Sequence, residues 1–320
     1  MTQLHVAAGA LVGADGRLLL ARRPPGKQLA GFREFPGGKL EPGESSVEAL
    51  CRELHEELAI DVTDVDPLPL IEVPWQHGST RLRLILHRVR AWQGRPRPCE
   101  GQTLAWQDPS AVELATLAPA DRYMLRALRL PDMYPITPDL AADADPALVR
   151  QWLQRQVAGG AGLMQLRLPQ WSHQAVREAA AECLPGMRDA GAALLLHADV
   201  EGALQLGTGV HLQARQLSAL SARPLPDKQW VGASCHTARE LQQALTLGVD
   251  FAVLSPVKST RTHPDTEPMG WSRFAELVAQ TPLPVYAMGG MTPADTVTAQ
   301  RAGAQGVAGI RAFEPSRSRR

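Results

Sequence analysis

The pattern of apolar and polar residues changes in character near residue 130. Before that point, the apolar runs "HVAAGALV" and "RLLLARR" flank the turn "GADG", which is typical of a β-hairpin. The stretch "TRLRLILHRVRAW" is rich in β formers and predicts a strand, and "PADRYMLRALRL" predicts a helix. Another helix is expected from Ser45 to about Leu58, because Ser45 and Glu48 have the spacing of a capping box. This order predicts an α+β domain over residues 1–130.

Beyond "LPDMYPITPDL", short apolar runs alternate with helical segments. The runs are "MYPIT", "LMQLRL", "AALLLHA", "GVHLQ", "WVGASCH", "FAVLSPV", "PVYAMGG" and "GVAGIRA". Continuous apolar strands alternating with helices indicate a parallel sheet that is covered on both faces. Eight of them predict an α/β TIM barrel, (β/α)8, over residues 136–314, after a linker at 131–135 and before a tail at 315–320. The segment is short for that fold, so an incomplete outer ring of helices and an open doubly wound sheet both remain as alternatives.

Composition and charge exclude several classes of protein. A length of 320 residues suggests roughly two domains. The 33 basic residues balance the 33 acidic ones, so the basic excess typical of a polynucleotide-binding protein is missing. The four cysteines are scattered, which argues against a disulfide framework and a zinc site and favours a reducing cytoplasm. The sequence shows neither an apolar run of membrane-spanning length nor the pattern of a signal peptide, so no membrane association is expected.

The segment "GGKLEPGESSVEALCRELHEELAI", residues 37–60, concentrates acidic residues after two glycines. On a helix, Glu53, Glu56 and Glu57 are related by i,i+3 and i,i+4 and therefore share one face. Like charges at this spacing destabilise a helix. The face could be simply solvated, with Arg52 paired to Glu56. Alternatively, its three carboxylates could bind a hard cation such as Mg²⁺ through oxygen.

The residues before this helix resemble the Nudix box of nucleoside-diphosphate-linked hydrolases. Gly38, Glu44 and "RELHEELAI" follow one another at that family's spacing, and the only departure is Ala59, where the family has glycine. Alanine there would cost about 1 kcal/mol in a left-handed helix end. The segments "ARR", "FPGGKLEPGE" and "EGQTLAW" make the MutT type the closest match. The resemblance implies an α+β sandwich and Mg²⁺, or Mn²⁺ in its place.

The same resemblance implies roles for individual residues. The metal ligands would be the carboxylates of Glu53, Glu56, Glu57 and Glu100 with the carbonyl of Gly38, and Glu100 could instead act as a base. Arg52 would orient the glutamates, and Glu44 would support the corner between loop and helix. Arg23, Phe35 and Gly37 would lie along a nucleoside triphosphate. Bound Mg²⁺ neutralises phosphate charge and acidifies a bound water. The products that the resemblance implies are a nucleoside monophosphate and pyrophosphate.

The expected substrate is 8-oxo-dGTP, which MutT-type enzymes remove from the nucleotide pool before it damages DNA. In those enzymes an asparagine near the last helix reads the purine edge, and the resemblance puts Asp121 at that position. An ionised aspartate only accepts hydrogen bonds, whereas asparagine also donates them. Asp121 could still bind the N–H groups of a guanine edge. Alternatively, it could simply be an acidic residue at a helix start.

The second half resembles the thiamine phosphate synthase and TenI family. The resemblance rests on "YPIT", "LMQLRL", "GVHL", "GASCHTAREL", "SPVKSTRTHPD", "PVYAMGGMTP" and "AGAQGVAGI". The last two strands end in glycine-rich turns, where barrels commonly bind phosphate through backbone N–H groups. The candidates for a thiazole phosphate or a related precursor are therefore Gly289, Gly290, Gly309 and Ile310. These glycines could also serve only the tight turns.

The chain departs from the synthase at the positions that would hold Mg²⁺. The resemblance aligns Ala198, next to Asp199, and Gln216 with the two metal-binding aspartates. Pro169 and His263 stand where basic residues are expected. Without these ligands the metal and the diphosphate lose their anchor, so synthase activity is not expected.

TenI-type proteins instead tautomerise a thiazole phosphate without metal. Their general base is a histidine that corresponds to His236, and imidazole titrates near neutral pH. His236 could also be a hydrogen-bonding residue that caps the next helix. Gln165 and Arg167 lie two apart on one strand and could both meet the ligand. Three further functions remain open: a non-catalytic ligand-binding barrel, a hydrolase of thiamine-pathway diphosphates, and a bifunctional hydrolase and synthase.

Overall fold

The computed structural model describes residues 3–260 and 267–313. The predicted tail at 315–320 and His263 lie outside them. The chain forms two compact units, chiefly the residues up to Arg129 and those from Leu130 onward. Among the described residues, no helix has the length and apolar character needed to cross a membrane.

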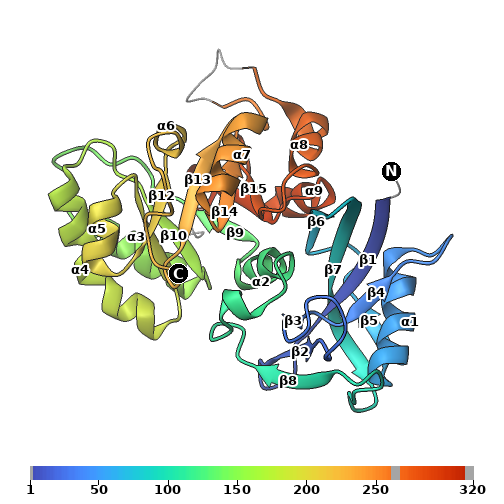
Figure 1. The fold of residues 1–320 in the computed structure, drawn as a ribbon. Helices are drawn as coiled ribbons and strands as arrows, with labels where there is room; N and C mark the ends of the chain where they lie inside the picture. Colours follow the sequence, from blue (N-terminus) through green and yellow to red (C-terminus); the bar gives the residue numbers. More distant parts are fainter. Residues whose placement is uncertain (1–2, 261–266, 314–320) are drawn as a thin grey trace. The chain divides into compact units, whose positions relative to one another are not determined.

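The first unit contains two sheets and two α-helices (Figure 1). Its strands are β1 (Gln3–Leu11), β2 (Leu18–Arg22), β3 (Arg33–Glu34), β4 (Gly37–Lys39), β5 (Asp61–Val65), β6 (Ile71–His77), β7 (Thr80–Gln93) and β8 (Thr103–Gln107). Its helices are α1 (Ser46–Leu58), the 3-10 helix η1 (Leu114–Thr116) and α2 (Asp121–Arg129). One sheet has the order β4-β1-β7-β5 with β6 paired to β7, and the other has the order β3-β2-β8. Since β1 and β7 are parallel and the other pairs antiparallel, the larger sheet is mixed.

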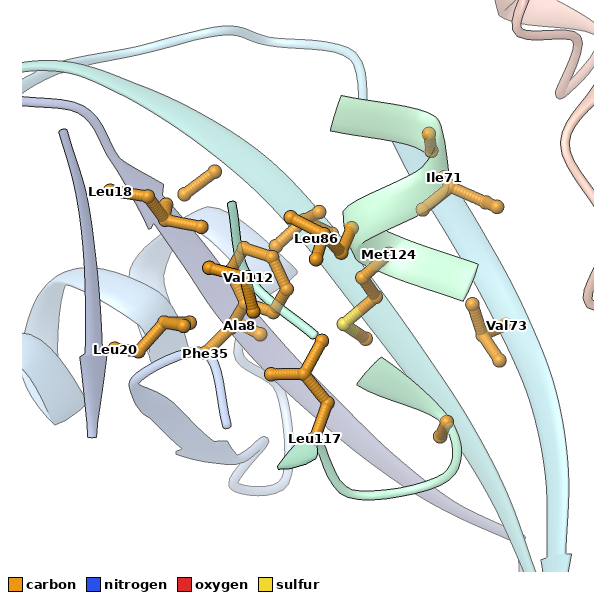
Figure 2. Close-up of a cluster of buried hydrophobic side chains, with 14 residues drawn as sticks. Ala8, Leu18, Leu20, Phe35, Ile71, Val73, Leu86, Val112, Leu117 and Met124 are labelled. Carbon is orange, nitrogen blue, oxygen red and sulfur yellow. The ribbon is translucent and has the colours of Figure 1, made fainter. Parts of the chain in front are cut away.

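The two helices cover opposite faces of β1, because residues along a strand alternate in direction. Ala7 and Leu11 pack with the apolar side of α1, whereas Ala8 and Ala10 belong to the cluster that includes α2. Figure 2 shows this second cluster, in which Met124 of α2 lies among side chains from several strands and loops. The first unit is therefore the predicted α+β sandwich.

The hairpin expected around "GADG" is only partly present. The turn closes with a hydrogen bond from Gly13 N to Arg17 O (2.8 Å), and a single antiparallel bridge joins Val12 to Leu18. The strands then separate, because β1 pairs with β4 and β7 while β2 pairs with β3 and β8. The prediction was wrong about the pairing because local turn residues cannot specify which distant strand offers the better partner.

Helix α1 begins and ends as its sequence predicts. Ser45 is the N-cap, and the reciprocal hydrogen bonds of a capping box join it to Glu48. The buried face carries Ala49, Leu50, Leu54 and Leu58, which leaves the acidic residues on other faces. Ala59 ends the helix in the left-handed conformation, at φ 51° and ψ 44°, as expected for the family's glycine position.

The second unit is an eight-stranded parallel barrel. Its strands are β9 (Met133–Pro135), β10 (Leu163–Leu166), β11 (Ala193–His197), β12 (Gly209–Leu212), β13 (Val231–Cys235), β14 (Phe251–Leu254), β15 (Val285–Ala287) and β16 (Gly306–Gly309). From β10 to β16 each strand pairs with the next in chain order, and β16 pairs with β9. A bridge between Ile136 and Gln165 joins the residue after β9 to β10 and nearly closes the ring. Because β9 lies at 133–135, most of the expected linker at 131–135 is the first barrel strand.

The outer ring of helices is incomplete, as one of the sequence alternatives proposed. The helices are α3 (Ala147–Ala158), α4 (His173–Asp189), α5 (Val200–Leu206), α6 (Ala214–Leu217), α7 (Ala238–Leu247), α8 (Gly270–Val278) and α9 (Thr296–Arg301), with the 3-10 helices η2 (Pro293–Asp295) and η3 (Arg311–Phe313). Helix α6 has only four residues, and among the described residues β16 is followed only by η3. The strands themselves are buried on both sides, which explains their continuous apolar runs.

We expect the substitution Ala59→Gly to stabilise the first unit by about 1 kcal/mol, because glycine adopts the left-handed conformation without strain. The measurement is the urea midpoint of that unit's unfolding transition. Ala49→Gly, inside the same helix, is the control and should destabilise the unit by about 1 kcal/mol or more. Equal destabilisation by both substitutions would show that the helix end is not strained.

Candidate functional site

Arg52 connects the carboxylates at the centre of the acidic segment. Its Nε and Nη2 donate to Glu44 at 2.8 and 3.0 Å, and its Nη1 donates to Glu53 at 3.0 Å. A longer bond of 3.4 Å reaches Glu56, which is the ion pair expected from their spacing. Nη2 also donates to the carbonyl of Lys39, so the helix is joined to β4. The hydrogen bonds from Arg52 lower the pKa of Glu44 to about 2.

Two glycines bring backbone next to these carboxylates. A Cβ atom on Gly38 would collide with the carboxylate of Glu53, so the side chain of Glu53 lies directly against the backbone of Gly38. A Cβ atom on Gly37, which has φ 143°, would collide with the carbonyl oxygen of Ala7. The amide of Gly37 donates to Glu57 Oε2 at 3.3 Å. The loop and helix therefore place Gly38 beside Glu53 and Gly37 beside Glu57.

Glu57 carries a carboxyl group with a strongly raised pKa. Burial is the main cause that brings its pKa to about 7, with the charges of Glu100, Glu34 and Glu53 acting in the same direction and the hydrogen bond from Gly37 against it. Glu100 lies on the loop before β8, where its side chain accepts from Lys27 Nζ at 2.9 Å. The carboxylates of Glu53 on α1, Glu34 on β3 and Glu100 on this loop are thus near enough to Glu57 to repel its charge.

These residues fit a hard divalent cation by their chemistry. Carboxylate and carbonyl oxygens are the ligands that Mg²⁺ prefers, and the mutual repulsion raising the pKa of Glu57 would be relieved by a cation. Within the described part of the chain, no three His, Cys, Asp or Glu side chains are already gathered as a ligand set. Arg52 forms ion pairs with Glu53 and Glu56, and Lys27 forms an ion pair with Glu100. A cation bound by these carboxylates would replace those ion pairs.

A second acidic pair lies beside this cluster. Arg23 donates to Glu34 at 2.6 Å and to the carbonyl of Gln28 at 3.0 Å. Asp121, the first residue of α2, is buried and accepts from the amide of Phe35 at 2.8 Å. Burial raises the pKa of Asp121 to about 7, opposed by that hydrogen bond, and the charge of Glu34 adds to the increase. The Asp121 carboxyl therefore keeps its proton to a higher pH than an exposed aspartate does, and in its protonated form it can donate as well as accept.

The side chain of Phe35 lies in the apolar core of the first unit. It is 4% exposed and packs with Leu20, Leu117 and Met124 (Figure 2). Because its ring is enclosed by apolar side chains, its backbone is the part that could meet a nucleotide, and that contact stays a prediction. Sequence similarity could not distinguish a ring that lines a site from one beneath it.

In the barrel, His236 directly follows β13 and is exposed. Its Nδ1 lies 2.8 Å from the carbonyl oxygen of Ser255. A carbonyl only accepts, so Nδ1 carries the proton and the neutral ring keeps a lone pair on Nε2. The N-cap of α7 is Thr237, in a capping box with Glu240, so the imidazole of His236 is not the cap. The backbone amide of His236 also donates to Glu240 at 2.6 Å.

Gln165 and Arg167 have different surroundings. Gln165 is buried, and its side chain lies 2.8 Å from His197 Nδ1, while Gln213 lies 2.9 Å from His197 Nε2. Burial lowers the pKa of His197 to about 4, so its ring is neutral and one of the two amides must present its oxygen. Arg167 instead pairs with Asp139. Gln165 therefore faces the barrel interior, and the guanidinium of Arg167 is partly exposed at an ion pair.

The two positions aligned with metal-binding aspartates contact each other without a carboxylate. Gln216 Nε2 donates to the carbonyl of Ala198 at 3.1 Å. The neighbouring Asp199 is engaged elsewhere: it is the N-cap of α5 and forms two hydrogen bonds of 2.8 Å with Arg177. Asp199 therefore cannot replace the missing ligand without breaking a buried ion pair.

The glycine-rich turns lie where the sequence places them, after the last two strands. Gly289 and Gly290 have φ values of 98° and 65°, and added Cβ atoms would meet Pro256 and the backbone of Ser259. Gly309 ends β16, with Ile310 next to it. Tight packing alone therefore requires glycine at 289 and 290, and phosphate binding there stays a prediction.

Sequence reasoning missed four residues that the structure brings to these sites. Glu34 and Lys27 are charge partners of predicted residues, Gln102 joins Glu57 to Glu100, and His197 lies between two glutamines. The sequence offered a signal for two of them. Glu34 directly precedes the MutT-like segment "FPGGKLEPGE", and Gln102 lies inside the segment "EGQTLAW". The others become visible only through long-range contacts.

Comparison with known proteins matches the two units to two different families. The family model "Thiamine monophosphate synthase" matches residues 133–313, and the model "NUDIX domain" matches residues 2–128. The thiamine-phosphate synthase of Laribacter hongkongensis is 34% identical over 181 residues, which are 56% of this chain and 84% of the relative.

Other relatives match the first unit. The CTP pyrophosphohydrolase of Escherichia coli is 39% identical over 132 residues, covering 40% of this chain and 92% of that protein. An 8-oxo-dGTP diphosphatase of Proteus vulgaris is 49% identical over 85 residues, covering 26% of this chain and 76% of the relative. The chain therefore belongs to the Nudix family through its first unit and to the thiamine monophosphate synthase and TenI family through its second.

Proposed function

We propose that the first unit is a Mg²⁺-dependent pyrophosphohydrolase that converts a nucleoside triphosphate to a monophosphate and pyrophosphate. The observation that carries this proposal is the cluster of Glu53, Glu57 and Glu100 beside the backbone of Gly37 and Gly38. The relatives named CTP pyrophosphohydrolase and 8-oxo-dGTP diphosphatase support it.

In this proposal the carboxylates of Glu53, Glu56 and Glu57 and the Gly38 carbonyl hold Mg²⁺ or Mn²⁺. Bound by these residues, the metal would supply positive charge against the phosphate chain and would lower the pKa of the attacking water. Glu100, on its own loop beside Glu57, accepts the proton from that water. Arg52 fixes the orientation of Glu53 and is itself held by Glu44.

The base of the nucleotide would be recognised by Glu34 and Asp121, near Arg23. Two carboxyl groups accept from an exocyclic amine, and a protonated Asp121 also donates to a ring nitrogen or carbonyl. Both 8-oxoguanine and cytosine carry such groups. The substrate expected from sequence, 8-oxo-dGTP, is our first candidate, and CTP is the second because the acidic pair suits an amine beside an acceptor.

For the second unit we propose a metal-free, TenI-like activity on a thiazole phosphate. His236 Nε2 would move the proton, because Nδ1 is held by the Ser255 carbonyl. The hydrogen bond between Gln216 and Ala198 supports loss of the synthase metal site. The alternative is a barrel that binds this ligand without turnover. The His236 experiment below distinguishes the two possibilities.

The hydrolase proposal predicts that Glu53→Gln and Glu57→Gln each lower kcat by at least about a hundredfold, because each removes a charged oxygen ligand. The measurement is Mg²⁺-dependent release of pyrophosphate from 8-oxo-dGTP, dGTP and CTP, of AMP from ADP-ribose, and of inorganic phosphate from thiamine-type diphosphates. Glu41→Gln, in the same loop, removes the same charge and should retain activity. Full activity in both site variants would contradict the proposed site, and wild type inactive on all nucleotides would contradict the proposed function.

Asp121→Asn tests base recognition and the buried carboxyl group together. The raised pKa means that the folded state binds more protons between about pH 4 and pH 7, so stability falls as pH rises through that range. The substitution should therefore raise the free energy of unfolding at pH 8, by on the order of 2 kcal/mol, with little change at pH 4. Asp64→Asn, on an exposed strand position, is the control.

The same Asp121 variant should change the ratio of kcat/KM values for 8-oxo-dGTP and CTP by about tenfold or more, because one hydrogen-bonding group at the base is altered. An unchanged ratio together with an unchanged pH profile of stability would exclude Asp121 from both roles.

For the barrel, His236→Ala and His236→Asn should both abolish tautomerisation of the thiazole phosphate while binding is retained. Asparagine can still donate to the Ser255 carbonyl but has no basic nitrogen near neutral pH. Binding is measured by calorimetry and turnover by ultraviolet absorbance, with His173→Ala as the control. Wild type that binds the ligand without turnover would establish the non-catalytic alternative.

A further inference from the structure

The side chain of Gln102 joins the two parts of the acidic cluster. Its Oε1 accepts from the backbone amide of Glu100 at 2.7 Å, and its Nε2 donates to the backbone carbonyl of Glu57 at 3.0 Å. The residue is 8% exposed, so both bonds are shielded from water. One neutral side chain thus connects the backbones of two carboxylate residues that lie 43 positions apart in the sequence.

The loop before β8 is attached to the end of α1 by further bonds. The amide of Cys99 donates to Glu57 O at 3.0 Å, and the amide of Arg97 donates to Leu58 O at 3.0 Å. The last carbonyls of a helix have no partner within the helix, so they are available to such a loop. Gln102 adds the contact nearest to Glu100.

The carboxylate of Glu100 is held much more loosely than its backbone. It forms an ion pair with Lys27, and both side chains are about half exposed (56% for Lys27 and 47% for Glu100). Exposed ion pairs contribute little to stability and exchange readily. The backbone of Glu100 is therefore fixed while its side chain is free to exchange Lys27 for another cation.

We propose that Gln102 is a positioning residue that holds Glu100 beside Glu57 for the metal-dependent hydrolysis. This inference rests on the proposed function of the first unit, in which Glu100 acts beside the metal ligands. Gln102 acts through the two backbones and does not itself touch substrate or metal. The rival possibility is that Gln102 only fastens a loop.

Position 102 requires a side chain that carries a hydrogen-bond acceptor and a hydrogen-bond donor at the end of a chain as long as that of glutamine. Methionine has a similar length but neither strong group, and glutamate keeps the acceptor while losing the donor. An ionised glutamate would also face the carbonyl of Glu57 and add charge to an acidic cluster. Both Gln102→Met and Gln102→Glu should therefore release Glu100 from the helix.

The experiment uses the full chain with these two variants and Gln107→Met, which removes an amide from the far end of β8, the strand that follows Gln102. Hydrogen exchange by mass spectrometry reports on residues 97–101, and Mn²⁺ affinity is measured by electron paramagnetic resonance. Steady-state kinetics with Mg²⁺ give kcat and the half-saturating metal concentration.

We expect both Gln102 variants to exchange faster over residues 97–101 and to lose about tenfold or more in Mn²⁺ affinity or kcat, with Gln107→Met unchanged. Faster exchange with unchanged affinity and kcat would show that Gln102 only fastens the loop, which overturns the inference. Unchanged exchange would also overturn it. A wild-type chain that binds Mn²⁺ but hydrolyses no nucleotide would instead refute the proposed function. Mn²⁺ affinity would still test the role of Gln102, because Gln102 also holds the backbone of Glu57, a metal ligand in the proposal.

Discussion

The interaction on which the first unit's site depends is the network between Arg52 and its acidic neighbours. One guanidinium holds Glu44, contacts Glu53 and Glu56, and reaches the carbonyl of Lys39. Without that positive charge, a helix with three glutamates near one end would repel itself. The network leaves Glu57 outside its reach, beside Gly37, where burial and neighbouring charge raise the pKa of its carboxyl group. A cation would complete the neutralisation that Arg52 begins.

The barrel differs in charge from the acidic cluster of the first unit. Its interior contains neutral polar groups, with His197 between two glutamines and His211 beside Tyr134 and Ser234. Burial lowers the pKa of both histidines, to about 4 for His197 and about 3 for His211, so neither adds charge at neutral pH. At the two positions that the resemblance aligns with metal-binding aspartates, Gln216 donates to the backbone carbonyl of Ala198. The two units are thus suited to different chemistry.

The sequence predicted the features that depend on nearby residues. The capping box at Ser45, the left-handed end at Ala59 and the eight apolar strands follow from short-range pattern, and the structure confirms them. Features set by distant contacts were not predictable in this way. The strand pairing after "GADG", the burial of Phe35 and the raised pKa of Asp121 each depend on packing against other parts of the chain. Gln102 was overlooked because its role appears only when residues 57 and 100 meet.

Mg²⁺-induced stabilisation of the first unit tests directly whether the acidic cluster of α1 is a cation site. The measurement is its thermal unfolding midpoint with and without saturating Mg²⁺ at pH 8, for wild type and for the double variant Glu53→Gln, Glu57→Gln. A bound ligand stabilises the folded state in proportion to the logarithm of its concentration over Kd. We predict a clear increase in the midpoint for wild type that the double variant lacks. An unfolding midpoint of wild type that does not change with Mg²⁺ would contradict a metal site at these glutamates. An equal increase in the midpoints of wild type and the double variant would also contradict it.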